Sequence, residues 1–343
     1  MMRLSLLTLL SILMLSGCGD RSSESEPVGT INVYTSRHYD SDRVLYNAFE
    51  AQSGIRVRFR EMSSSALLET MKAEGDASPA DVVISADAGT LWRFQSENLL
   101  QPITSNRLEN AIPTKFREPD GHWFGLAKRI RVIVYDPERQ SEETVGEYGQ
   151  LADETLENEL CMRSSSNIYN LSLMSELIER WGEAEAARWA SAVEDNFARA
   201  PQGGDTAQIE SIAAGECSAA LINHYYWVRL AASRSEDRRA LAEKTALAFP
   251  STGEGTHVNV TGAGVAANSP NRDAAIAFLE FLASPKGQEL LVTETKEFPM
   301  LEGVPLPDGL ENLPDYVESA VSLIKLGENQ VEAQAIYDRA GWN

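Results

Sequence analysis

The stretch Ile130-Arg-Val-Ile-Val-Tyr135, closed by Asp136-Pro137, decides the fold. Its apolar and β-branched residues predict a buried strand, and the proline ends it because proline cannot donate to a sheet ladder. A second strand pattern runs from Val258 to Ala266, far along the chain. We predict that two strands, at 128–135 and 258–267, cross between two halves of the molecule.

Short apolar runs alternate with helical patterns on both sides of these strands, which is typical of an α/β protein. Residues 30–127 form one such set, and residues 136–257 form a second. We expect about 268–300 to return to the first set and part of 301–343 to join the second. The predicted fold is therefore two α/β lobes joined by two hinge strands, an arrangement that closes on a ligand by hinge bending.

The composition excludes several classes of protein. Lys and Arg number 30 against 51 Asp and Glu, for a formal net charge of −21 in a chain of 343 residues. An acidic excess of this size argues against nucleic acid or an anionic membrane surface as the main partner. The apolar share of 43% is that of a globular protein, so wholesale disorder is excluded as well.

The N-terminus predicts export. An apolar run over residues 4–15 would span only about 18 Å as a helix, against the roughly 30 Å of a bilayer core. We therefore interpret residues 1–17 as a signal peptide. The stretch Leu15-Ser-Gly-Cys18 resembles a bacterial lipobox, which predicts lipidation of Cys18 and a short tether over 18–29. The alternative is a plain signal peptide, with Cys18 incidental.

Four tyrosines stand where predicted strands end and helices begin. Tyr39 follows the first strand, and Tyr169 lies between a strand and a helix. Tyr225 and Tyr226 follow the predicted strand Ala219 to Ile222. Open α/β sheets place ligands at the carboxyl ends of their strands, where helix N-termini favour negative charge and would stabilise a phenolate. The alternative is an aromatic cluster that binds an organic ligand.

A cluster of phenols indicates a hard, highly charged cation. A phenol with a pKa near 10 is neutral in water, and such a cation is what ionises its oxygen at neutral pH. Four phenolates around Fe(III) would leave one excess negative charge, which a nearby arginine would relieve. Arg229 lies on the same predicted helical face as Tyr225 and Tyr226. Arg129 and Arg131 lie on the first crossing strand. For each arginine the alternative is a solvated surface charge.

Four stretches together carry a resemblance to a known family: Tyr34-Thr-Ser-Arg-His38-Tyr39, Leu67-Leu-Glu-Thr-Met-Lys-Ala-Glu-Gly75 with Ser78-Pro-Ala-Asp81, Arg163-Ser-Ser-Ser-Asn-Ile-Tyr169, and Asn223-His-Tyr-Tyr226. They resemble the periplasmic ferric-iron-binding proteins, the substrate-binding subunits of ABC iron importers, and among these the FutA type. The resemblance extends from about residue 30 to the C-terminus.

The resemblance implies the type II, transferrin-like fold of periplasmic binding proteins, with Fe(III) bound between the lobes. It also implies delivery of iron to an inner-membrane permease and its ATPase, by a protein that we expect to be monomeric and not an enzyme. The residues that it assigns to the site are the metal ligands His38, Tyr39, Tyr169, Tyr225 and Tyr226 and the cleft arginines Arg129 and Arg229. Whether His38 binds the metal directly, and whether the site also takes Fe(II), are left open.

Two cysteines remain beside Cys18, in a compartment where a disulfide persists. Cys161 and Cys217 each lie at or near the start of a predicted strand that leads toward a tyrosine. We expect a Cys161–Cys217 disulfide that braces this lobe, and the alternative is two separate buried thiols.

Other functions have weaker support. Gly262-Ala-Gly-Val-Ala-Ala267 fits the spacing of a dinucleotide site, but Asn268-Ser-Pro270 intervenes before the next helix. The tyrosines could instead stack on a small organic or anionic solute. An enzyme with a tyrosinate-bound iron would need an open coordination position and a base, and the sequence indicates neither.

Overall fold

The computed structural model describes residues 28–37, 39–251 and 255–343. The predicted signal peptide, the lipidation site Cys18 and the predicted ligand His38 lie outside the described residues. Among the helices that are described, none has the length and apolar character to span a bilayer.

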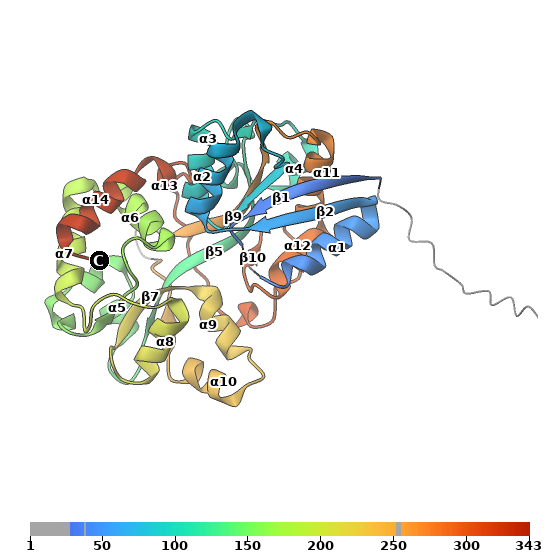
Figure 1. Ribbon diagram of the computed structural model, residues 1–343. Helices are drawn as coiled ribbons and strands as arrows, with labels where there is room; N and C mark the ends of the chain where they lie inside the picture. The colour runs from blue at the N-terminus through green and yellow to red at the C-terminus, as the bar shows by residue number, and fades with distance from the viewer. Residues whose placement is uncertain (1–27, 38, 252–254) are drawn as a thin grey trace, which may run out of the picture.

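Two long strands connect the halves of the molecule (Figure 1). They are β5 (Phe124–Tyr135) and β9 (Val258–Ala266), which are antiparallel neighbours. Residues Phe124–Ile130 of β5 pair with β9, whereas Arg131–Tyr135 pair with β7 (Ala219–Asn223). The first crossing strand therefore begins earlier than the predicted residue 128, because its first half is held in place by β9 rather than by its own apolar run.

One half of the molecule is built mainly from the chain before β5, with helices that return after β9 (Figure 1). Its strand β1 runs parallel to β2 on one side and to β3 on the other. Its elements are β1 (Gly29–Thr35), α1 (Asp42–Ser53), β2 (Ile55–Glu61), α2 (Ser64–Glu74), β3 (Val82–Ser85), α3 (Ala88–Ser96), β4 (Leu100–Gln101), α4 (Asn106–Ala111), α11 (Arg272–Leu282), α12 (Pro285–Thr293) and β10 (Phe298–Pro299).

The other half is built from the chain between β5 and β9 and from the C-terminal helices (Figure 1). Its strand β7 lies between β5 and β6. Its elements are α5 (Glu142–Val145), β6 (Leu160–Cys161), α6 (Ile168–Trp181), α7 (Glu183–Asp195), α8 (Asp205–Ala213), α9 (His224–Ala231), α10 (Glu236–Glu243), β8 (Ala246–Ala248) and α14 (Gln330–Ala340). The predicted α/β fold with two lobes and two crossing strands is confirmed, while the exact limits of the lobes stay a prediction.

A short C-terminal helix, α13 (Lys325–Glu328), packs against α3 of the first half and α6 of the second. Gly327 allows this approach, since a Cβ there would lie 2.5 Å from the Cβ of Trp92 on α3. The C-terminal segment thus contacts both halves, and α14 packs on α6 and α7.

The helices that follow β6 and β7 begin at asparagines. The Asn167 side chain accepts a hydrogen bond from the backbone N–H of Tyr169, at 3.1 Å, and so caps α6. Asn223 occupies the corresponding position of α9, but its side chain makes no cap. Its amide is turned toward Arg131 and the Tyr225 hydroxyl instead.

Cys161 and Cys217 form a disulfide, with Cα atoms 5.7 Å apart. Both residues are fully buried. Cys161 pairs with Ala220 in the parallel ladder of β6 and β7. The disulfide therefore joins the segments that lead to Tyr169 and to Tyr225.

Candidate metal centre

Three segments bring the four predicted tyrosines together. Tyr39 lies in the turn between β1 and α1, Tyr169 in the first turn of α6, and Tyr225 and Tyr226 in the first turn of α9. Tyr225 is almost completely buried, and the other three are half-buried. Each tyrosine thus stands near a helix N-terminus, as the sequence predicts.

Tyr225 contacts both Tyr169 and Tyr226. The Tyr225 hydroxyl donates to the Tyr169 hydroxyl at 3.3 Å, although the two residues come from different helices. The rings of Tyr225 and Tyr226 lie 4.5 Å apart between centroids. Three phenol groups of one lobe therefore share a single small volume.

Arg229 connects this group to Tyr39, which belongs to the other lobe. Its Nη2 donates to the Tyr39 hydroxyl at 3.4 Å. Its guanidinium carbon also lies 4.7 Å from the ring centroid of Tyr225 and 5.2 Å from those of Tyr39 and Tyr226. A cation placed among three phenols favours their ionised forms.

Three further arginines surround Tyr169. The guanidinium carbons of Arg129, Arg131 and Arg163 lie 5.6, 5.9 and 5.4 Å from its ring centroid. Arg129 and Arg131 project from β5 and are almost fully buried. Arg37 takes a similar place beside Tyr39, with its guanidinium carbon 5.0 Å from the centroid of that ring.

Buried carboxylates hold these arginines in place. Glu297 lies 3.0 Å from Arg129 and 3.2 Å from Arg37. Asp205 lies 3.0 Å from Arg131 and 2.8 Å from Arg163. These four arginines therefore have fixed geometry before any ligand binds.

The charges around the tyrosines do not cancel. Arg37 also pairs with Asp42 at 2.9 Å, which adds a third carboxylate to Glu297 and Asp205. Five guanidinium groups, those of the four arginines above and of Arg229, therefore face three carboxylates. With neutral phenols the site retains two positive charges, so it favours anionic groups among the tyrosines.

Burial favours the neutral forms of two of these phenols, those of Tyr225 and Tyr226. Burial raises the pKa of the Tyr225 phenol well above its ordinary value, and the nearby Tyr169 and Tyr39 raise it further, whereas Arg129 lowers it. Burial also raises the pKa of the Tyr226 phenol. A metal that binds phenolates here must displace protons, so its affinity falls as the pH falls.

Several groups of the site are absent from the sequence-based prediction. Arg37 lies two residues before Tyr39, and Arg163 begins the motif that contains Tyr169, so the sequence carries a local signal for both. Glu297 has no such signal. It contacts Arg129 and Arg37, which are far away in the sequence, so only the fold shows that it belongs to the site.

Glu297→Gln is expected to reduce the loss of stability on acidification. Burial alone would raise the pKa of the Glu297 carboxyl, but Arg129 and Arg37 hold it below its ordinary value. Ionised Glu297 therefore stabilises the fold at neutral pH, and this contribution is lost as the pH falls below about 4.5, through the folded-state pKa.

Urea unfolding of wild type and of Glu297→Gln from about pH 7 to about pH 3 measures this contribution. The difference between their free energies of unfolding should shrink toward the acid end. The matched control is Glu157→Gln at an exposed position, for which we expect no such trend. A gap between wild type and Glu297→Gln that stays constant over this range would contradict the prediction.

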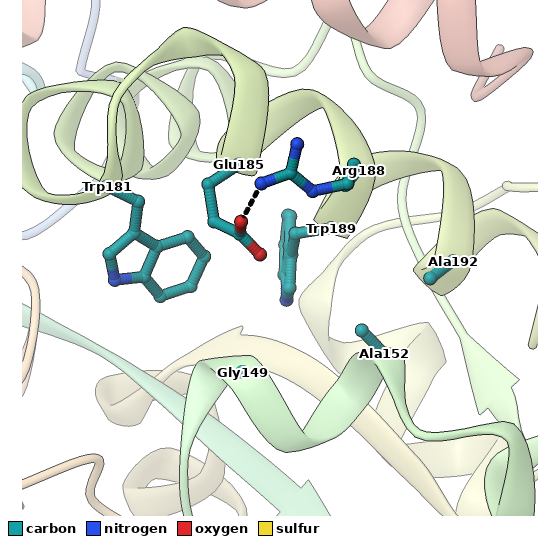
Figure 2. A pocket seen from close by; sticks show the side chains of 7 residues that line it. All are labelled: Gly149, Ala152, Trp181, Glu185, Arg188, Trp189 and Ala192. Atoms are coloured by element: carbon teal, nitrogen blue, oxygen red, sulfur yellow. Dashed lines mark hydrogen bonds and ion pairs between the residues drawn. The ribbon is translucent and has the colours of Figure 1, made fainter.

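A hollow of about 380 Å³ lies elsewhere, between η3 (Tyr148–Ala152), the end of α6 and one face of α7 (Figure 2). Trp181 and Trp189 face it, with ring centroids 6.1 Å apart. Its carboxylate, Glu185, is paired with Arg188. The hollow offers no set of hard-metal ligands and contains none of the four tyrosines.

A second group of possible metal ligands, found among the described residues, is Glu118, Asp120 and His122. One Glu118 oxygen already accepts from the backbone N–H groups of Asp120 and His122, both at 2.9 Å. It also lies 3.0 Å from Nδ1 of His122. These contacts stabilise a turn and explain the cluster without a metal.

The fold and the site together define a two-lobed binding protein. The model of the family described as bacterial extracellular solute-binding proteins matches residues 77–318, and the chain belongs to this family. It is 42% identical over 337 residues to the iron uptake protein A1 of Synechocystis, covering 96% of this chain and 93% of that protein. It is also 27% identical to the major ferric iron-binding protein of Neisseria meningitidis, covering 91% and 92% of the two chains.

Solved structures agree with this assignment. The structure of FutA (IdiA) from Trichodesmium, in complex with iron and citrate ligands, superposes with a TM-score of 0.88 at 41% identity, covering 92% of this chain and all of that one. Apo FutA2 from Synechocystis gives a TM-score of 0.86 at 42% identity, covering 92% and 99%. The predicted resemblance to the FutA type is confirmed.

Proposed function

We propose that this protein is the substrate-binding component of an ABC importer and that it binds ferric iron between its lobes. The observation that carries the proposal is the meeting of Tyr39, Tyr169, Tyr225 and Tyr226 amid a surplus of arginines. Relatives that are named for iron uptake or for ferric iron binding cover almost the whole chain and support it.

The four phenolates would be the metal ligands, with Arg129 and Arg229 beside them. Fe(III) with four phenolates has one excess negative charge, and the positive charge that the site retains would offset it. Fe(II) has one positive charge fewer and would ionise fewer phenols, so this environment favours Fe(III). His38 stays a predicted ligand outside the described residues, and the proposal rests on the four tyrosines.

The remaining assignments follow from the transport role. Iron would be captured in the periplasm by a monomer and delivered to an inner-membrane permease driven by its ATPase. Export by the signal peptide at 1–17 and anchoring through lipidated Cys18 are part of the proposal. A buried disulfide is consistent with an oxidising compartment.

Addition of Fe(III) to the metal-free protein is expected to produce a visible phenolate-to-iron charge-transfer band, with about one iron bound per chain. The band should fade on acidification, because protons compete for the phenolates. Absorption spectroscopy and metal analysis after gel filtration measure both results. A protein that stays colourless and takes up no iron would contradict the proposal. The same titration with Fe(II) in the absence of oxygen tests which oxidation state the site prefers.

A further inference from the structure

His224 is a fully buried histidine that directly precedes Tyr225 and Tyr226. Both of its ring nitrogens are bonded to the main chain of other segments. Nδ1 accepts from the backbone N–H of Ile130 at 3.1 Å, and Nε2 lies 3.0 Å from the carbonyl oxygen of Lys296. Because a backbone N–H can only donate, Nδ1 is the acceptor, and the ring proton must be on Nε2. Neither nitrogen is free to bind a metal.

The bond to Ile130 lies at the point where β5 changes partners. Up to Ile130 the strand pairs with β9, and from Arg131 it pairs with β7. The backbone N–H of Ile130 donates to the histidine ring, while that of Arg131 donates to the carbonyl of His257. His224 thus contacts the strand that joins the two lobes at the junction of its two ladders.

The bond to Lys296 fixes the segment that carries Glu297. Lys296 has a positive φ of 60°, which is uncommon for a side chain of this kind and needs support from its surroundings. The next residue is Glu297, which pairs with Arg129 and Arg37. The imidazole also lies between the rings of Phe298 and Tyr225, at 4.9 and 5.7 Å between centroids.

We infer that His224 is a positioning residue for the metal site: it fixes the Tyr225–Tyr226 pair relative to the Arg129–Glu297 pair and to the junction in β5. The inference rests on the proposed iron-binding function. It assigns to His224 no bond to iron, because both ring nitrogens are already used.

Two conservative variants separate the two bonds. In His224→Asn the side-chain oxygen takes the place of Nδ1 and keeps the acceptor for Ile130, while the donor to Lys296 is lost. In His224→Gln the amide nitrogen takes the place of Nε2 and keeps the donor to Lys296. His224→Leu loses both bonds, and His122→Gln, in the turn described above, is the control.

We expect His224→Leu to release iron about 10–100-fold faster and to shift the charge-transfer band, as is typical when a partner that orients metal ligands is lost. The two conservative variants should give intermediate values, and the control should match wild type. Thermal unfolding checks that each variant is folded. Variants that lose thermal stability but keep the wild-type band and release rate would show a merely structural role and would overturn the inference.

Failure of the proposed function has a different signature, since wild type itself would then show no band. In that case crystal structures of the metal-free variants decide. If His224 positions the site, the Tyr225 and Tyr169 hydroxyls, which are 3.3 Å apart in the wild-type chain, should move apart in His224→Leu. An unchanged arrangement of these tyrosines would overturn the inference.

Discussion

Tyr225→Phe is expected to abolish tight iron binding. Tyr225 is the most buried of the four tyrosines, and its hydroxyl contacts that of Tyr169. Removal of the oxygen takes away one charged ligand and leaves the site with surplus positive charge. Loss of an outer-shell partner alone typically costs about 10–100-fold in metal affinity, so loss of a ligand should cost more than about 100-fold.

This loss is measured by competition with a chelator of known affinity, in which the intensity of the charge-transfer band reports the fraction of protein that holds iron. Tyr34→Phe is the matched control, because the Tyr34 hydroxyl is bonded to Glu74 in the first half of the molecule, apart from the four tyrosines. We expect the control to bind iron as wild type does. Near-wild-type affinity in Tyr225→Phe would mean that Tyr225 is not a ligand.

Among the substitutions proposed here, removal of the disulfide is expected to lower the free energy of unfolding the most. Replacement of Cys161 and Cys217 by serine opens a link between residues 56 positions apart. In the chain-entropy model, closure of a loop of this length stabilises the folded protein by about 4 kcal/mol. The variant should unfold at a lower denaturant concentration.

Guanidinium unfolding of the double variant, beside wild type with and without reductant, measures the effect. Reduced wild type should resemble the variant, since both lack the link. The iron band should persist under native conditions, because the ladder of β6 and β7 still aligns the segments that lead to the tyrosines. Equal midpoints for oxidised wild type and the variant would contradict the prediction.

The parts of the fold that could be predicted are those with a strong local pattern. The β-branched run Ile130–Tyr135 and the stretch Val258–Ala266 predict the crossing strands. The first four residues of β5, 124–127, include Gly125 and have no such pattern, so only their pairing with β9 defines them. The two-residue strands β4, β6 and β10 are too short for any periodicity, and only β6 lies within a predicted strand.

The site shows the same division. The tyrosines could be found because each follows a strand and lies at or near the start of the next helix, which is a local property. The ion pairs of Glu297 with Arg37 and Arg129 depend on segments that meet only in the folded chain. His224 illustrates the limit, because nothing in Asn223-His-Tyr-Tyr226 shows that its ring bonds to Ile130 and Lys296.

The continuity of β5 has a mechanical consequence. β5 pairs first with β9 and then with β7, so a swing of one lobe must twist its backbone near Ile130, where the pairing changes. Arg129 and Arg131 stand on either side of this torsional axis and both lie against Tyr169. The same rotation that parts Tyr39 from the other phenols would therefore also turn the guanidinium groups. Separation of Tyr39 from the other phenols and rearrangement of the charge around them would then occur in a single movement.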